Sequence, residues 1–291
     1  HVKRAVSSGR LLWVSPLMVV DQTLSESDKF YGRELSIERV PAAGLQDWLN
    51  GSGFAIGITN YEAIRDGIER GSLCGLILDE SSNLKSHYGK WGTRLIKLGR
   101  GLEWKLAMTG TPAPNDRIEY ANHAVFCDHF RTTNEFLARY FVNKGQTQER
   151  WILKPHALKP FYRDLSHWCI FLSDPTVYGW KDNTESIPPI HVHIENVDLT
   201  PEQRTATQDL TGQLMVSEAG GIGQRSKLMQ IAKGKGGIPT NKPAAIKAMI
   251  DSWPDESTII WCHFNEEQVA MEKTFPDAAS IKGETPMEKR L

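Results

Sequence analysis

Short apolar runs of strand length recur through the first 125 residues of the chain. Each is bounded by turn residues, and the runs lie at 11–16, 54–59, 73–78 and 104–110. A further run at 35–40 alternates apolar and polar positions, which is typical of a more exposed strand. Helix-like stretches lie between these runs, at 60–71 and 89–101. Apolar strands that alternate with helices predict a parallel sheet covered on both faces.

The pattern changes after residue 115. Helical patterns rich in aromatic residues continue to about residue 185, and we expect no strand among them. Alternation returns at 190–199, and Thr200 is a good N-cap for a helix with Pro201 in its first turn. A strand at 257–264 between two helices ends the pattern. The chain therefore predicts an α/β lobe at 1–125, a helical insert at 126–189 and a second α/β lobe at 190–291.

Composition limits the class of protein. Of the 291 residues, 40% are hydrophobic and 24% are charged, which is typical of a globular chain with real cores. The net charge of -1 gives no overall attraction to nucleic acid, so any contact with a polyanion must come from local groups. The four cysteines form no C-x-x-C pair, and we expect reduced thiols in the cytoplasm. No run of about 20 apolar residues predicts a membrane span.

Two adjacent acids, Asp79 and Glu80, follow the apolar run at 73–78. Ligands of open parallel sheets bind beyond the carboxyl ends of the strands, where these acids would lie. Hydrolysis of a nucleoside triphosphate needs an oxygen ligand for Mg²⁺ and a group that orients or deprotonates the attacking water. An Asp followed by a Glu supplies one of each, although an ordinary solvated turn also fits this pattern.

A second strand exit, "MTGTPAPND" at 108–116, carries two hydroxyls and a glycine ahead of its prolines. It comes about thirty residues after Asp79, which leaves room for a helical crossover between parallel strands. Both exits would then open on one crevice, where the hydroxyls can hydrogen-bond the acids. A plain turn is the alternative interpretation of this segment.

"LILDESSNLK" (76–85) followed by "KLAMTGTPAPN" (105–115) resembles motifs II and III of superfamily 2 helicases. The closer similarity is to the Swi/Snf-like branch of double-strand DNA translocases, especially phage and prophage forms whose acidic box reads D-E-S-S. Weaker similarities to other motifs of the family, from motif Ia onward, occur in the order in which the family has them. Together with motifs II and III, they extend the resemblance over nearly the whole chain. They lie at 11–22, 56–64, 225–234, 257–268 and 280–286.

The resemblance implies two RecA-like parallel-sheet lobes, both incomplete, with a helical insert between them. Asp79 would coordinate Mg²⁺ through water, and Glu80 would be the catalytic base of ATP hydrolysis. The residues that would couple hydrolysis to lobe movement are Thr109, Gly110 and Thr111. Those in positions that touch the backbone of double-stranded DNA are Ser15, Pro16, Thr59 and Asn60, and Lys85 could join them. Such contacts give position without sequence preference, and we expect a monomer with no membrane partner.

ATP binding in this family depends on a P-loop, G-x-x-x-x-G-K-[ST], which the 291 residues do not contain. The resemblance places the P-loop upstream of residue 1 and motifs V and VI downstream of residue 291. We therefore expect a fragment that does not turn over ATP by itself.

Three alternatives stay open at the level of sequence. One is a DNA-binding scaffold with a degenerate ATPase fold, and another is a Mg²⁺-dependent nuclease that uses Asp79 and Glu80. A third concerns His123, Cys127 and His129, which stand close enough on a predicted helix for two or three of them to meet a Zn²⁺. Core packing is the favoured interpretation of these three residues, because a fourth ligand with suitable spacing is not evident.

Overall fold

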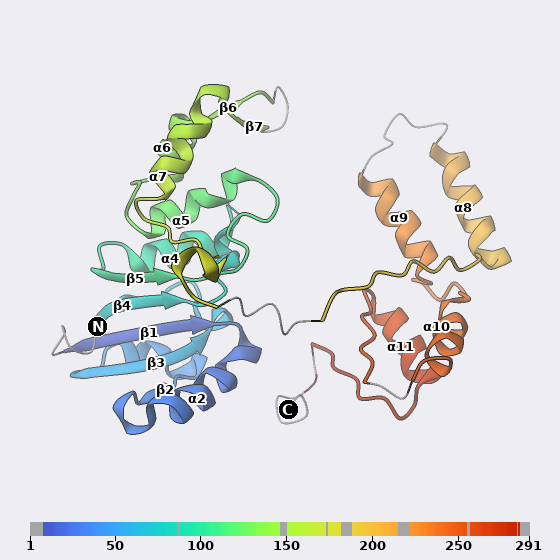
Figure 1. Ribbon diagram of the computed structural model, residues 1–291, viewed down its shortest axis with the longest axis horizontal. Helices are drawn as coiled ribbons and strands as arrows, with labels where there is room; N and C mark the ends of the chain where they lie inside the picture. The colour runs from blue at the N-terminus through green and yellow to red at the C-terminus, as the bar shows by residue number, and fades with distance from the viewer. Residues whose placement is uncertain are drawn as a thin grey trace. The chain divides into compact units, whose positions relative to one another are not determined.

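The structure is a computed structural model that describes residues 8–86, 88–145, 150–172, 174–181, 188–214, 222–254, 257–283 and 285. Packing divides the chain into two units, His1–Lys181 and Asp182–Leu291, whose helices and strands are labelled in Figure 1. Among the described helices, none combines the length and the apolar character that crossing a bilayer requires.

A five-stranded parallel sheet forms the centre of the first unit, with the strand order β2-β3-β1-β4-β5 (Figure 1). All four neighbouring pairs are parallel, so every strand has its carboxyl end at the same edge. The strands are β1 (Gly9–Ser15), β2 (Ile37–Arg39), β3 (Phe54–Asn60), β4 (Leu73–Leu78) and β5 (Trp104–Ala107). The predicted parallel sheet is confirmed.

The main core lies on one face of this sheet. Leu12, Leu76 and Leu78 on the central strands are fully buried there. They pack against α3 (Leu45–Leu49) and α4 (Lys90–Gly99), of which α4 buries Leu95 and Leu98 at helical spacing. Helix α2 (Leu17–Tyr31) contacts β2 and β3. These layers hold the strand ends in a fixed register.

The helix predicted at 60–71 is wrong, whereas the one predicted at 89–101 is confirmed as α4. Only a 3₁₀ turn, η3 (Tyr61–Ala63), forms after β3, and the side chain of Asn60 accepts the N–H of Ala63 at 3.1 Å. Further on, Gly67 and Gly71 have φ angles of 91° and 53°. An α-helix needs φ near −63°, so these two glycines end any helical continuation.

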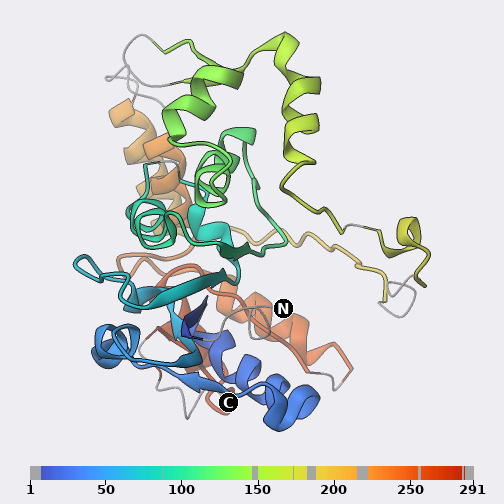
Figure 2. The ribbon, with the colours of Figure 1, turned by 90° about the vertical axis from the view of Figure 1, so that its left-hand side faces the viewer.

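The predicted helical insert contains α6 (Thr133–Tyr140) and α7 (Leu158–Leu165), which follow α5 (Tyr120–Phe126). In Figures 1 and 2 they stand beyond the β5 edge of the sheet, next to α5. Their core is separate and aromatic, and Phe136 and Phe161 meet with ring centroids 6.0 Å apart.

The expectation of no strand in this insert is wrong. An antiparallel hairpin forms from β6 (Phe141–Asn143) and β7 (Trp151–Leu153). The N–H of Lys144 extends it by donating to the carbonyl of Arg150 at 2.9 Å. Strands of three residues are too short for the hydrophobic period to reveal them.

The described helices of the second unit are α8 (Pro201–Leu214), α9 (Ile222–Ala232), α10 (Lys242–Asp251) and α11 (Asn265–Thr274). The predicted N-cap of α8 is confirmed, because the Thr200 hydroxyl accepts the N–H of Gln203 at 3.2 Å. The Gln203 side chain in turn accepts the N–H of Thr200 at 3.0 Å. The pair therefore forms a capping box.

The strands predicted at 190–199 and 257–264 do not form. Several of their apolar side chains are exposed instead, with exposed fractions of 89% for Ile190 and 88% for Trp261. A strand is held by a ladder to a neighbour, and the described part of this unit supplies no such neighbour. The segment at 280–286 also has no strand in its described part, whereas Glu284 and Pro286 lie outside the described residues.

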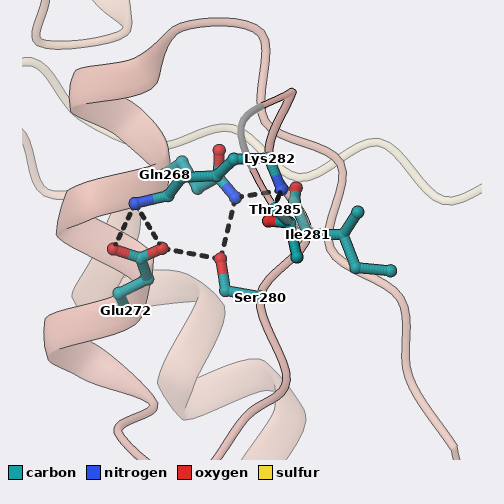
Figure 3. A network of polar contacts seen from close by, with 6 residues as sticks. All are labelled: Gln268, Glu272, Ser280, Ile281, Lys282 and Thr285. Atoms are coloured by element: carbon teal, nitrogen blue, oxygen red, sulfur yellow. Dashed lines mark hydrogen bonds and ion pairs between the residues drawn. The ribbon is translucent and has the colours of Figure 1, made fainter. Parts of the chain in front are cut away.

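Polar contacts hold the segment after residue 279 against α11 (Figure 3). The amide of Gln268 donates to the Ser280 hydroxyl at 2.8 Å and to the Ile281 carbonyl at 3.1 Å. The carboxylate of Glu272 accepts from Ser280 at 2.6 Å and from the Lys282 ammonium at 2.9 Å. One helical face thus fixes three consecutive residues without a sheet.

Candidate functional site

The ends of β1, β4 and β5 meet at one edge of the sheet. The N–H of Asp79 donates to the carbonyl of Val14 at 2.8 Å, which extends the ladder one residue beyond β4. On the other side, the N–H of Met108 donates to the carbonyl of Leu78, and the N–H of Ser81 donates to the carbonyl of Met108, both at 2.8 Å. These bonds fix the acidic pair and the hydroxyl-rich exit side by side.

Glu80 and Thr109 come together across this edge. The Thr109 hydroxyl lies 3.4 Å from each carboxylate oxygen of Glu80, and it accepts the N–H of Thr111 at 3.1 Å. Glu80 is exposed, so its carboxylate stays open to solvent. The exposed Gly110 links the two threonines. The structure therefore joins the two strand exits that the sequence placed in one crevice.

The backbone of Glu80 is left-handed, with φ 50° and ψ 53°. This region is uncommon for a residue with a Cβ, and it costs on the order of 1–3 kcal/mol. The hydrogen bonds of the flanking residues, Asp79 and Ser81, hold the chain in this turn. The sharp reversal directs two adjacent carboxylates out of the same strand end.

Two hydroxyls fix Asp79. The buried Ser15 donates to Oδ2 of Asp79 at 3.2 Å, and Tyr61 donates to the backbone carbonyl of Asp79 at 2.8 Å. Burial, followed by the charges of Asp79 and Glu80, raises the pKa of Tyr61 well above its usual value. Tyr61 therefore stays protonated and remains a donor. Sequence reasoning missed this residue, although its position directly after the β3 exit was a usable signal.

A buried pair supports the acidic turn from α5. The Ser81 hydroxyl lies 3.1 Å from Nε2 of His123, and Nδ1 of His123 lies 3.3 Å from the carbonyl of Glu119. A carbonyl can only accept, so Nδ1 carries the proton and Nε2 accepts from Ser81. Burial lowers the pKa of His123, which favours this neutral form. The pair therefore anchors Ser81, the residue after Glu80, to α5.

No protein-family model matches the chain, and no curated protein matches it. A solved structure does match it, the Sulfolobus solfataricus SWI2/SNF2 ATPase core in complex with dsDNA. The TM-score is 0.50 at 16% sequence identity, and the match covers 94% of this chain and 60% of the solved chain. The chain shares the RecA-like fold of that ATPase core. It spans about 60% of the solved chain's length. The predicted α/β fold class is confirmed.

The predicted role of Asp79 as a Mg²⁺ ligand stays a prediction, and its carboxylate has the donor chemistry for it. Its Oδ2 accepts from Ser15, and no hydrogen bond in the described part of the chain uses Oδ1. Carboxylate oxygens are the ligands that Mg²⁺ prefers. The site therefore offers one oxygen for an ion and, beside it, the exposed carboxylate of Glu80.

The zinc alternative finds no support in the same fold. Among the described residues, no three His, Cys, Asp or Glu side chains gather into a metal-binding group. Both ring nitrogens of His123 are engaged with Ser81 and Glu119. Burial raises the pKa of Cys127 to about 11, which disfavours the thiolate that binds zinc.

Two of the residues predicted to touch nucleic acid are engaged within the chain. Thr59 is 3% exposed and its hydroxyl donates to the carbonyl of Val40 at 2.8 Å. Asn60 caps η3 through Ala63. Their contacts to a DNA backbone stay predictions, and the structure gives both side chains a role in the fold.

The other predicted contacts lie at the ends of β1 and β4. Ser15 is fully buried against Asp79, and the half-buried Pro16 precedes α2. Lys85 is exposed, and no acidic side chain in the described part of the chain pairs with it. Lys85 is therefore available for the phosphate contact that the sequence predicted.

Proposed function

We propose that this chain is part of an ATP-dependent motor that moves along double-stranded DNA. The observation that carries the proposal is the contact between Thr109 and the exposed Glu80 at the carboxyl edge of a parallel sheet. The similar solved structure, a SWI2/SNF2 ATPase core in complex with dsDNA, supports both the fold and the partner. Phage origin, monomeric state and a cytoplasmic location belong to the same proposal and come from the sequence resemblance.

Asp79 and Glu80 divide the chemistry between them. Asp79 would hold Mg²⁺, and the bound ion would supply neutralisation of the negative charge on the phosphates of ATP. Glu80 orients the attacking water and accepts its proton, because its carboxylate is exposed and, in the described part of the chain, has only the Thr109 hydroxyl as a partner. Ser15 and Tyr61 keep Asp79 in place while Glu80 reacts.

Thr109, Gly110 and Thr111 link the state of Glu80 to the rest of the unit. The Thr109 hydroxyl binds Glu80 and also accepts the N–H of Thr111. A change in the Glu80 contact on hydrolysis therefore moves the segment that follows β5. Contacts between the strand exits and the DNA backbone turn this movement into stepping without sequence preference.

The printed sequence contains no P-loop, and we expect the 291-residue chain by itself not to hydrolyse ATP. The decisive test therefore measures duplex-stimulated phosphate release from the full-length natural protein and from its Glu80→Gln variant. We expect kcat to fall by about 10²–10⁴-fold, with duplex binding retained. Glu103→Gln is the matched control, because this exposed residue lies at the opposite edge, just before β5.

Other outcomes identify the alternatives. Duplex binding without any ATP hydrolysis in the full-length protein would establish the DNA-binding scaffold and overturn the motor. Cleavage of DNA with Mg²⁺ and no ATP, abolished by Asp79→Asn, would establish the nuclease.

A further inference from the structure

A hollow of about 380 Å³ lies between α4, α5 and the beginning of α6. Three cationic side chains line it: Lys97 from α4, Arg100 directly after α4, and Arg131 from the segment before α6. Ile96 and Val125 form an apolar part of the wall. We call this hollow the α4–α6 basic pocket.

Positive side chains outnumber acids at the basic pocket. No Asp or Glu lines it, and within the described residues none of its three cations has an acidic partner within 4.0 Å. Two acids lie nearby: Asp66 pairs with Arg94, and Glu135 accepts the backbone N–H of Arg131 at 3.0 Å. A cleft lined by one sign of charge focuses its field and attracts counter-ions.

Neutral donors add to these cations. Thr132 and Thr133 line the pocket, and the Thr132 hydroxyl accepts the N–H of Glu135 at 3.1 Å. Its own O–H therefore remains able to donate outward. The eight-residue helix α6 begins at Thr133 and adds the positive end of its dipole.

The arrangement of donors selects the shape of the anion. Lys97 lies on α4 and Arg100 directly after it, whereas Arg131, Thr132 and Thr133 belong to the segment that leads into α6. A tetrahedral oxyanion offers acceptor oxygens in both directions, whereas a planar carboxylate offers two oxygens in one plane. Guanidinium forks also match phosphate oxygens in pairs.

We propose that the α4–α6 basic pocket binds a phosphate group, carried either by a nucleic-acid backbone or by a free small molecule. This site contains neither acid of the proposed ATP cleft, so it does not depend on hydrolysis. The phosphate could belong to a nucleic-acid backbone or to a free small molecule, and two titrations distinguish these sources.

The test titrates the 291-residue chain with inorganic phosphate by calorimetry, and with a 20-base-pair duplex by fluorescence anisotropy. The pocket variant is Arg100→Gln with Arg131→Gln. The matched control is Lys159→Gln with Arg163→Gln, two exposed cations on α7 without acidic partners in the described part of the chain. We expect phosphate affinity to fall roughly tenfold or more in the pocket variant and to stay unchanged in the control.

The duplex titration identifies the source. If the pocket holds a backbone phosphate, the pocket variant also weakens duplex binding, and the slope of log affinity against log salt decreases by about 1–2. If it holds a free phosphate compound, only the phosphate titration changes. Arg131→Gln alone serves as a second variant, because this exposed residue lies outside the helices.

Three results would overturn the proposal. The first is equal phosphate affinity in the pocket variant and the control. The second is the absence of phosphate binding by the unaltered chain. The third is displacement of the bound duplex by an acidic peptide under conditions in which inorganic phosphate does not displace it.

Discussion

Single side chains at the carboxyl edge show which parts of the site follow from sequence. Asp79, Glu80 and Thr109 could be predicted to meet, because parallel strands all end at one edge. His123 could not, because it reaches the acidic turn from a helix whose packing the local pattern does not specify. Tyr61 was missed, although its position directly after β3 gave a usable signal. The left-handed turn at Glu80 was equally hidden, since it depends on hydrogen bonds from both neighbouring strand exits.

The neutral imidazole of His123 gives a prediction about stability. Burial lowers its folded pKa below the unfolded value of about 6.5. The unfolded chain therefore binds the proton first as pH falls. Stability from this group is complete above about pH 6.5 and decreases below it, by up to about 1.4 kcal/mol per pH unit, until the folded pKa is passed.

Urea unfolding at pH 7.5 and 5.5 checks this prediction. The comparison is with His123→Gln, whose side-chain oxygen can still accept from Ser81. We expect the variant to lose less stability than the unaltered chain between these pH values. Equal losses of stability in the two proteins would show that folding does not lower the pKa of His123.

Whole elements were predictable where a single pattern governs them. The apolar runs of β1, β3 and β4 gave strands because each is buried between neighbours. The alternating segment at 190–199 has the same local preference but no neighbouring strand in the described part of its unit, so the preference is not realised. The hairpin of β6 and β7 is the reverse case, because its strands are too short to give a readable pattern.

The aromatic core of α6 and α7 gives a prediction for Phe161. This ring is 1% exposed and contacts Phe136 and Tyr140 edge to face. We expect Phe161→Ala to lower the free energy of unfolding by about 3–5 kcal/mol, through lost burial and the cavity left behind. Chemical denaturation measures this loss. The control is Leu158→Ala on the same helix, at a side chain that is 43% exposed, and a similar loss in both variants would contradict the packing argument.

The two units of the molecule differ in how far their apolar side chains are buried. The first unit holds both large buried clusters. In the second unit, strand-like segments leave large side chains open to solvent, with exposed fractions of 76–89%. These side chains are Ile190, Val192, Ile194, Ile259 and Trp261.

Exposure of this kind predicts binding of an apolar dye. We expect replacement of Ile190, Val192 and Ile194 by Thr to lower ANS fluorescence of the 291-residue chain by about twofold or more. The control replaces the interleaved His191 and His193 by Thr and should leave the signal unchanged. If the first variant also keeps its full signal, the dye binds elsewhere and the exposed segment is not an apolar surface.

The strand order also has a consequence for synthesis. The central strand β1 is the most N-terminal of the five, and both of its neighbours, β3 and β4, come later in the chain. Ser15 and Asp79, which meet at the finished edge, are 64 positions apart. At about 5–20 residues per second, a ribosome therefore leaves the β4 side of the apolar β1 unpaired for roughly 3–13 seconds. We expect this nascent segment to engage a holding chaperone until translation has delivered both of its partners.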